Sequence, residues 1–254
     1  MPFEVITSRQ NARIVLAASL KNKKHRDQTG LFCAEGRMLL SEAILSGIYP
    51  KTVFATEENL PFIPEICHKD TCIVTDEVFK KISNDDCPEG VMSIFEKFTL
   101  PADEPSTAIV LENLQDPGNV GTVIRTAAAL GCELCVCASC ADVFNPKTQR
   151  SAMGALFRMP VEICSDSEKA ILSLKERGFR VVGAALDKKS LPVSETDLSG
   201  KCAVVIGNEG HGLTEKAKEL CDNLSIIPMK GMESLNASVA ASLYIWEMLK
   251  TREK

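Results

Sequence analysis

The chain has 254 residues, of which 45% are hydrophobic and 25% charged, and its formal net charge is −5. This composition is that of an ordinary globular protein, and the length suits one large or two modest domains. No apolar run approaches membrane-spanning length, and the first residues, MPFEVITSRQNAR, do not form a signal peptide. We therefore expect a cytoplasmic protein that has no membrane partner.

Eleven cysteines are expected to be reduced thiols in that compartment. Four of them crowd together at Cys132, Cys135, Cys137 and Cys140. Their segment LCVCAS has the character of a buried strand, in which cysteine acts as a small hydrophobe. No histidine lies nearby and the second cysteine pair of common zinc modules is missing, so we expect packing rather than metal binding.

Basic residues concentrate at the start of the chain. Residues 1–30 contain six Lys or Arg against two Asp or Glu, a charge of +4 that leaves −9 for the remainder. A basic start on an acidic body marks a nucleic-acid contact, although a solvated helix face is the commoner cause of any single charge run.

The first hundred residues alternate helical and strand-like patterns and predict a small α/β sandwich. The stretch LPADEPST, with two prolines and two acids, then indicates a boundary. We predict a first domain at 1–98, a linker at 99–106 and a second domain at 107–254. Helices are expected at Asn11–Leu20, Arg37–Leu45 and Asp76–Ile82, and strands at Thr52–Ala55, Cys72–Thr75 and Val91–Phe95.

Beyond the boundary, near-continuous apolar strands are separated by helices, which predicts a parallel sheet covered on both faces. Ligands of such sheets bind beyond the carboxyl ends of the strands. Strands are expected at Ala108–Leu111, Leu134–Ala138, Arg180–Ala184, Ala203–Ile206 and Leu224–Ile227, and helices at Val120–Leu130, Glu168–Arg177, Thr214–Leu220 and Leu235–Lys250.

Two loops at that edge carry unusual residues. In LENLQDPGNVGTVIRTAAALG, Asn119 lies at a helix start and Arg125 stands among apolar residues, where it is either a ligand contact or a surface residue with a snorkelling stem. In VVIGNEGHGL, three glycines let backbone approach a ligand, but their order differs from the dinucleotide fingerprint. Glu209 beside them either accepts from a ligand hydroxyl or caps the next helix.

The third loop, IPMKGMESLNASVAASLYIWE, turns from a strand into a helix that opens with Ser234, Asn236 and Ser238. These residues either cap the helix or hold a polar ligand. The histidines fit no nucleophile–base pattern, and no acidic cluster or H-E-x-x-H motif indicates a catalytic metal.

Together the three loops resemble the three motifs of the SpoU (TrmH-like) RNA 2′-O-ribose methyltransferases of the SPOUT class. The first motif corresponds to Asn119 and Arg125, the second to Gly207-Asn208-Glu209-Gly210, and the third to Ile227-Pro228-Met229 with Ser234-Leu235-Asn236. NPKTQRSAMGALFRMPV is similar to the family's intervening region, whereas the loop from Gly231 to Ser234 is a residue shorter than in many members. The front half, from ITSRQNARIVLAASLKNKKHR onward, is similar to the L30e-like substrate-binding domain of these enzymes.

The resemblance implies a deep trefoil knot that forms the pocket for S-adenosyl-L-methionine, and a homodimer formed through the catalytic domain. The apolar stripe Val239, Leu243, Trp246 and Leu249 serves either that interface or core packing. The implied cofactor-binding residues are Ala184, Gly207, Asn208, Ile227, Met229 and Leu235; the implied catalytic residues are Arg125, Asn119, Glu209, Ser234 and Asn236; and the implied RNA-binding residues are Arg9, Arg13, Lys23, Lys24 and Arg26.

In the implied reaction a ribose 2′-hydroxyl attacks the sulfonium methyl in line. We expect Arg125 to bind phosphate and polarise that hydroxyl, because a guanidinium stays protonated. The RNA is ribosomal, which the front domain favours, or transfer RNA. Two other classes fit the sequence less well. A Rossmann oxidoreductase would need a G-x-G-x-x-G that is missing, and an RNA-binding protein with this fold but no activity would lack motif residues.

Overall fold

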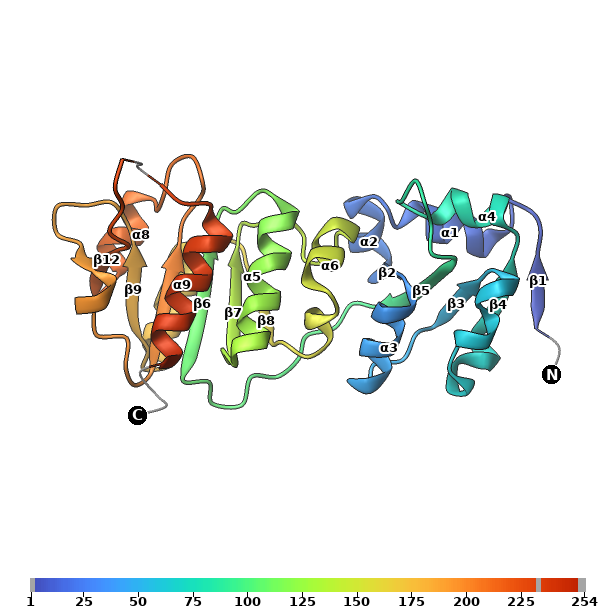
Figure 1. Cartoon of the computed structure of the whole chain (residues 1–254), viewed down its shortest axis with the longest axis horizontal. Coiled ribbons are helices and arrows are strands. Elements are labelled where there is room, and N and C mark those ends of the chain that lie inside the picture. The colour runs from blue at the N-terminus through green and yellow to red at the C-terminus, as the bar shows by residue number, and fades with distance from the viewer. Residues whose placement is uncertain (1–2, 232–233, 251–254) are drawn as a thin grey trace. The chain divides into compact units, whose positions relative to one another are not determined.

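The chain forms two compact units in a computed structural model that describes residues 3–231 and 234–250 (Figure 1). One unit comprises Met1–Phe98 and Phe144–Phe157, and the other comprises Thr99–Val143 and Arg158–Lys254. The sequence-based domain bounds stay a prediction, although the first unit also has a limit at residue 98. The assignment of Phe144–Phe157 to the first unit was not expected, because these residues lie well inside the second half of the sequence. Within the described ranges, no helix is long and apolar enough to cross a membrane.

The first unit is built on a five-stranded mixed sheet in the order β1-β4-β3-β5-β2. β5 pairs antiparallel with both β2 and β3, whereas β4 pairs parallel with β1 and β3. The predicted α/β sandwich is confirmed, but β1, β2, α2 and α6 were missed. The strands are β1 (Glu4–Ile6), β2 (Leu31–Glu35), β3 (Thr52–Ala55), β4 (Thr71–Val74) and β5 (Val91–Glu96), and the helices are α1 (Ala12–Ser19), α2 (Lys23–Thr29), α3 (Arg37–Leu45), α4 (Asp76–Ile82) and α6 (Pro146–Ala152).

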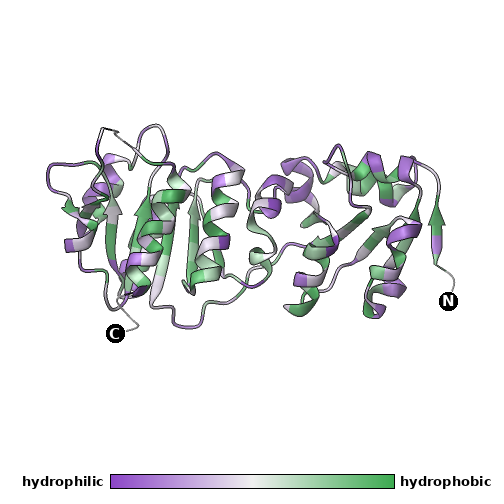
Figure 2. Ribbon diagram, viewed as in Figure 1, coloured by the Kyte–Doolittle hydropathy of each residue, from purple (hydrophilic) through white to green (hydrophobic). Residues whose placement is uncertain are grey.

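The second unit is built on a seven-stranded sheet in the order β10-β12-β9-β11-β6-β7-β8, in which every neighbouring pair is parallel. The predicted parallel sheet is therefore confirmed, and Figure 2 shows its central strands as hydrophobic. The short strands β8 and β10 were missed. The strands are β6 (Thr107–Glu112), β7 (Leu134–Ala138), β8 (Val161–Cys164), β9 (Arg180–Ala184), β10 (Leu191–Pro192), β11 (Cys202–Ile206) and β12 (Asn223–Ile226).

Four helices cover this sheet: α5 (Pro117–Leu130), α7 (Ser167–Glu176), α8 (Glu215–Leu220) and α9 (Ala237–Lys250). α7 and α8 share a core with alternate residues of the strands, including Val110 and Val136. α5 and α9 lie side by side over the sheet (Figure 1), where Ser242 Oγ and Thr126 Oγ1 are 3.4 Å apart. The order of the strands makes β12, β9, β11 and β6 neighbours, so the loops that follow them meet at one edge. The trefoil knot stays a prediction.

Candidate functional site

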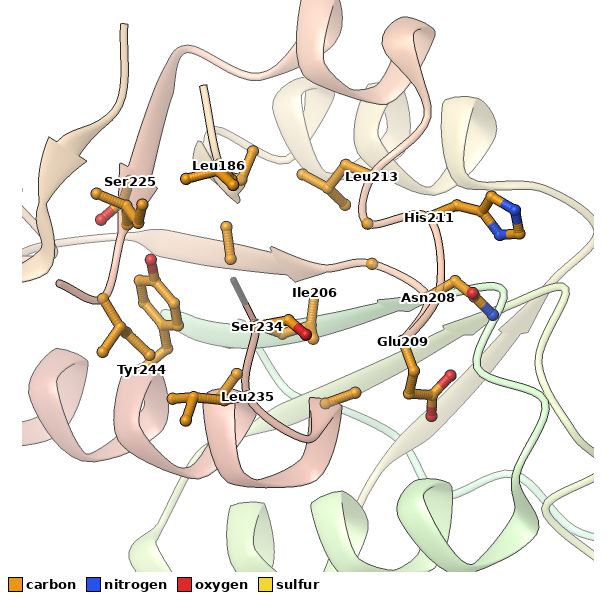
Figure 3. A pocket seen from close by; sticks show the side chains of 18 of the residues that line it. Leu186, Ile206, Asn208, Glu209, His211, Leu213, Ser225, Ser234, Leu235 and Tyr244 are labelled. Atoms are coloured by element: carbon orange, nitrogen blue, oxygen red, sulfur yellow. The ribbon is translucent and has the colours of Figure 1, made fainter. Parts of the chain in front are cut away.

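A cavity of about 400 Å³ opens at that edge, between the loops that follow β9, β11 and β12 and the first turns of α9 (Figure 3). Its volume lies within the roughly 300–1,000 Å³ range of small-molecule sites. All six residues predicted to bind the cofactor line it: Ala184, Gly207, Asn208, Ile227, Met229 and Leu235. Residues 232 and 233 of the loop that was expected to be short lie outside the described residues.

The turn at Gly207 is possible only for glycine. A Cβ built there would lie 2.2 Å from the carbonyl carbon of Gly212 and 2.4 Å from the backbone nitrogen of Leu213. The loop folds back at this point because Asn208 and Gly212 exchange two backbone hydrogen bonds of 2.8 and 3.1 Å. Gly207 therefore serves close packing of backbone on backbone, which gives the cavity one rigid wall.

The side chain of Asn208 also stabilises this loop. Its Nδ2 donates to the carbonyl of Asn113 at 2.9 Å, and its Oδ1 accepts from the backbone N–H of Gly210 at 2.8 Å. The first bond joins the loop after β11 to the loop after β6. Asn208 lines the cavity while both its polar side-chain atoms are already engaged within the protein.

Three catalytic candidates form one chain of hydrogen bonds at the rim of the cavity. Asn236 Nδ2 donates to Asn119 Oδ1 at 3.1 Å, and Asn119 Nδ2 donates to Glu209 Oε1 at 2.7 Å. The three side chains come from the three sequence motifs, and the partners lie 117 and 90 residues apart. The structure therefore brings Asn119, Glu209 and Asn236 together.

Asn236 caps α9 and also belongs to the chain of hydrogen bonds at the rim. Its Oδ1 accepts from the backbone N–H groups of Ser238 and Val239 at 2.9 and 3.3 Å, so it caps α9. Its Nδ2 is thereby free to point away from the helix toward Asn119. Capping and site formation use different atoms of one amide.

The other two catalytic candidates are placed differently. Ser234 lines the cavity beside Leu235 (Figure 3). Arg125 is exposed on α5, does not line the cavity, and makes no hydrogen bond or ion pair with any residue of the described ranges. It is therefore a cation that remains available to a ligand outside this unit.

Sequence reasoning missed Glu112, the last residue of β6. This side chain is only 1% exposed, and its carboxylate accepts from Ser167 Oγ at 2.5 Å and from Thr214 Oγ1 and N–H at 2.8 and 2.9 Å. The Glu112 carboxylate thereby holds Ser167, the first residue of α7, and Thr214, the N-cap of α8. Because Thr214 directly follows the glycine loop, Glu112 also anchors the end of that loop. An acid at the end of an otherwise apolar strand was the signal available in the sequence.

The basic residues of the first unit divide into two groups. Arg9 and Lys24 are exposed, Arg13 forms an ion pair with Glu4 at 2.9 Å, and Lys23 pairs with an aspartate at 2.6 Å. Arg26 is different, because it is 1% exposed and its guanidinium donates to the carbonyls of Leu20 and Lys21 at 2.8 and 2.9 Å. A buried guanidinium cannot reach a phosphate, so we withdraw Arg26 from the predicted RNA-binding set.

All eleven cysteines are free thiols. The predicted strand LCVCA is β7, and all five of its residues are buried. Burial raises the pKa of Cys132 to about 11 and that of Cys33 to about 12, so both thiols stay protonated at neutral pH. In the described part of the chain, no group of three or more His, Cys, Asp or Glu side chains could hold a metal ion.

Comparison with known proteins identifies the family. The model of the SpoU rRNA Methylase family matches residues 106–246, more than half of the chain. The chain belongs to this family. A second model, the MRM3-like substrate binding domain, matches residues 11–93.

Relatives of this SpoU protein match along nearly its full length. It is 32% identical to a Bacillus subtilis protein named 23S rRNA (guanosine(2553)-2′-O)-methyltransferase RlmP, over 96% of this chain and 98% of that protein. It is 28% identical to the mitochondrial rRNA methyltransferase 3 of Xenopus laevis, over 89% of this chain and 71% of that one. The crystal structure of an AdoMet-bound rRNA methyltransferase from Sinorhizobium meliloti superposes with a TM-score of 0.88 and 29% identity, covering 98% of both chains.

These findings confirm that the SpoU chain is an RNA 2′-O-methyltransferase and that S-adenosylmethionine is its cofactor. The cavity suits such a ligand. It combines apolar walls with a glycine turn that no side chain could occupy, and the buried hydroxyl of Tyr244 in its lining has no hydrogen-bond partner among the described residues.

Proposed function

We propose that this enzyme methylates a ribose 2′-hydroxyl of 23S ribosomal RNA, with S-adenosylmethionine bound in the cavity of the second unit. The observation that carries the proposal is the chain Asn236–Asn119–Glu209, which joins the three motif loops at the rim of that cavity. The RNA class is supported by the Bacillus relative, which is named for 23S rRNA and matches both units of this chain.

In this proposal the cofactor supplies an electrophilic methyl group on a sulfonium, and the protein orients the hydroxyl that receives it. Asn119, held between Glu209 and Asn236, positions the ribose, and the exposed Arg125 binds a neighbouring phosphate. Because a guanidinium stays protonated, Arg125 polarises the hydroxyl and does not remove its proton. As the new O–C bond forms and the C–S bond breaks, the proton passes to solvent at the exposed rim. Holding the two reactants in line is the main contribution that such a site makes to the rate.

The first unit would hold the RNA through Arg9, Arg13, Lys23 and Lys24. Phosphate contacts of this kind fix the register of an RNA and weaken as salt rises. The match of residues 11–93 to a substrate-binding domain supports this role. The cytoplasmic location belongs to the same proposal and is supported by the eleven free thiols, which suit a reducing compartment.

We also propose that the enzyme works as a homodimer through α9. Three apolar side chains on this helix, Val239, Leu243 and Trp246, are 47%, 43% and 57% exposed in the single chain. α9 lies against α5, which carries the exposed Arg125, so this face adjoins an arginine that the single chain leaves without a hydrogen-bond partner among the described residues. Sedimentation analysis tests this point: the wild type should sediment as a dimer and Trp246→Glu as a monomer. A monomeric wild type would contradict it.

The proposed target is tested by mapping 2′-O-methyl sites in total RNA from cells with and without the gene. We expect a 23S rRNA site to disappear and to return with the wild type but not with Arg125→Ala. The variant should keep its fold and its affinity for S-adenosylhomocysteine. Loss of a methyl group from transfer RNA instead would refute the 23S assignment, and full rescue by Arg125→Ala would refute the role of the arginine.

A further inference from the structure

The innermost part of the cavity contains an unpaired hydroxyl. Tyr244, in the third turn of α9, is 1% exposed and lines the cavity, yet its hydroxyl has no hydrogen-bond partner among the described residues. Its neighbours on the buried face of the helix are Ala241, Ile245 and Met248. A Phe or Leu at this position would pack here without burying an unpaired polar group, so the presence of the hydroxyl calls for a functional explanation.

Ser225 on β12 lies near the Tyr244 hydroxyl but is not its hydrogen-bond partner. Its hydroxyl lies 2.8 Å from Thr196 Oγ1 and shares a hydrogen bond with it, and no bond of acceptable geometry joins it to Tyr244. Figure 3 shows the tyrosine hydroxyl pointing into the cavity, toward the side on which Ser225 and Leu186 lie. Burial, the larger influence, raises the pKa of Tyr244, and an interaction with the nearby Ser225 hydroxyl lowers it, so the Tyr244 hydroxyl is protonated at neutral pH. This interaction is a close approach and not a hydrogen bond, because the Tyr244 oxygen meets the geometry of a hydrogen bond with no described residue and the Ser225 hydroxyl is engaged with Thr196.

The cavity has a buried floor and an exposed rim. Ser225 and Tyr244 are almost completely buried, whereas Glu209 and His211 at the other end are exposed. Glu209 belongs to the polar chain that we propose to orient the RNA hydroxyl. The sulfonium must lie near that chain, and it joins the adenosine to the amino-acid part of the cofactor. The amino-acid part carries an ammonium and a carboxylate, which are costly to bury, so the adenine must lie toward the buried floor. This step rests on the proposed function.

The floor matches the chemistry of a purine. Leu213, Ala240 and the ring of Tyr244 are apolar lining residues that suit the face of a flat heterocycle. The edge of adenine carries three ring nitrogens that only accept hydrogen bonds. We propose that the Tyr244 hydroxyl donates a hydrogen bond to one of these ring nitrogens, which makes Tyr244 a specificity-determining residue for the cofactor.

The variant Tyr244→Phe removes the hydroxyl and keeps the ring. Binding of S-adenosylhomocysteine is measured by calorimetry without RNA. We expect the dissociation constant to rise about 5- to 30-fold, the effect of leaving one neutral partner unpaired. The control is Tyr49→Phe, because the chain has two tyrosines and Tyr49 is exposed; its affinity should equal that of the wild type.

The melting temperature of the ligand-free protein separates cofactor binding from a structural role. If the hydroxyl is unpaired without ligand, Tyr244→Phe should melt at the wild-type temperature or above it. A hydroxyl that only supports the fold would give the opposite pair of results, a lower melting temperature with unchanged affinity. That pair would overturn the proposal.

The atom that accepts the bond is identified with three S-adenosylhomocysteine analogues in which N1, N3 or N7 of adenine is replaced by C–H. One analogue should bind wild type and Tyr244→Phe with equal affinity, because the bond is absent from both complexes. If the variant loses the same factor with all three analogues, a ring nitrogen is not the partner and the proposal fails. A wild type that does not bind S-adenosylhomocysteine at all would refute the cavity as the cofactor site, a failure that is distinct from either of these.

Discussion

The substitution Gly207→Ala tests whether the backbone packing of the loop after β11 builds the cofactor site. The new Cβ would lie 2.2 Å from the carbonyl carbon of Gly212 and 2.4 Å from its oxygen, both backbone atoms that no rotamer change can move. The loop must open, and opening breaks the two hydrogen bonds between Asn208 and Gly212.

The cost can be estimated from these contacts. Overpacking typically costs about 1–3 kcal/mol, and each backbone hydrogen bond contributes about 0.5–1.5 kcal/mol. Opening the loop relieves the clash and breaks the two bonds, so the two costs do not add, and we take about 1–3 kcal/mol for the loss of the binding conformation. That range weakens cofactor affinity about 5- to 140-fold.

Calorimetric titration with S-adenosylhomocysteine measures the effect, and Gly210→Ala is the matched control in the same loop. A Cβ at Gly210 would have Asn208 Oδ1 at 3.4 Å as its nearest neighbour, an ordinary contact. Gly210→Ala should therefore bind like the wild type. Equal affinities for Gly207→Ala and Gly210→Ala would refute the reasoning, because the clash would then have no bearing on the site.

Three further predictions follow from particular side chains. Asn236→Asp keeps the acceptor that caps α9 and loses the donor to Asn119, so methyl transfer should fall at least about tenfold while the melting temperature is unchanged. Asn236→Ala loses the cap as well, so it should also lower the free energy of unfolding by about 1 kcal/mol. Lys24→Ala should reduce RNA affinity and flatten its salt dependence by about one ion in filter binding, whereas Arg26→Ala should lower the melting temperature because it strands buried carbonyls. A thiol reagent at pH 8 should label the exposed Cys87 before Cys33. Folding raises the pKa of Cys33 from 9.0 to about 12. The contribution of this thiol to the free energy of unfolding is therefore complete below pH 9 and is lost as the pH rises toward 12. We expect the free energy of unfolding of Cys33→Ala to decline less steeply at alkaline pH than that of the wild type.

The sequence predicted the elements that depend on local patterns. β7 and β9 have the predicted bounds because each is a short run bounded by turn residues, and α3 and α4 were likewise correct. β8 was missed because polar and exposed residues interrupt it, and β10 was missed because it has only two residues. A strand at the edge of a sheet needs no continuous apolar run, so its pattern is weak.

Local sequence patterns could not predict contacts between residues that are far apart in the sequence. The sequence placed Asn119 at a helix start and left Glu209 as a ligand contact or a cap, and only the fold could show that the two side chains bond to each other. Arg26 looked like its basic neighbours, because charge patterning says nothing about which face of a short helix turns inward. Tyr244 was overlooked for the converse reason: within an apolar helix its ring suggests packing, and only the cavity makes its hydroxyl significant.

The placement of Asn236 and Tyr244 on one helix has a mechanistic consequence. Asn236 caps α9 at the rim of the cavity, and Tyr244 lies eight residues later at its floor, about 12 Å along the axis at the usual rise of an α-helix. A small rotation of α9 would move the asparagine away from Asn119 and the tyrosine away from the floor at once. Under the proposed roles, a contact that holds α9 in this position, such as a second copy packed on Trp246, positions the cofactor-binding Tyr244 and the RNA-orienting Asn236 together. Disrupting that face should then weaken cofactor affinity and methyl transfer in parallel, even though Trp246 does not line the cavity.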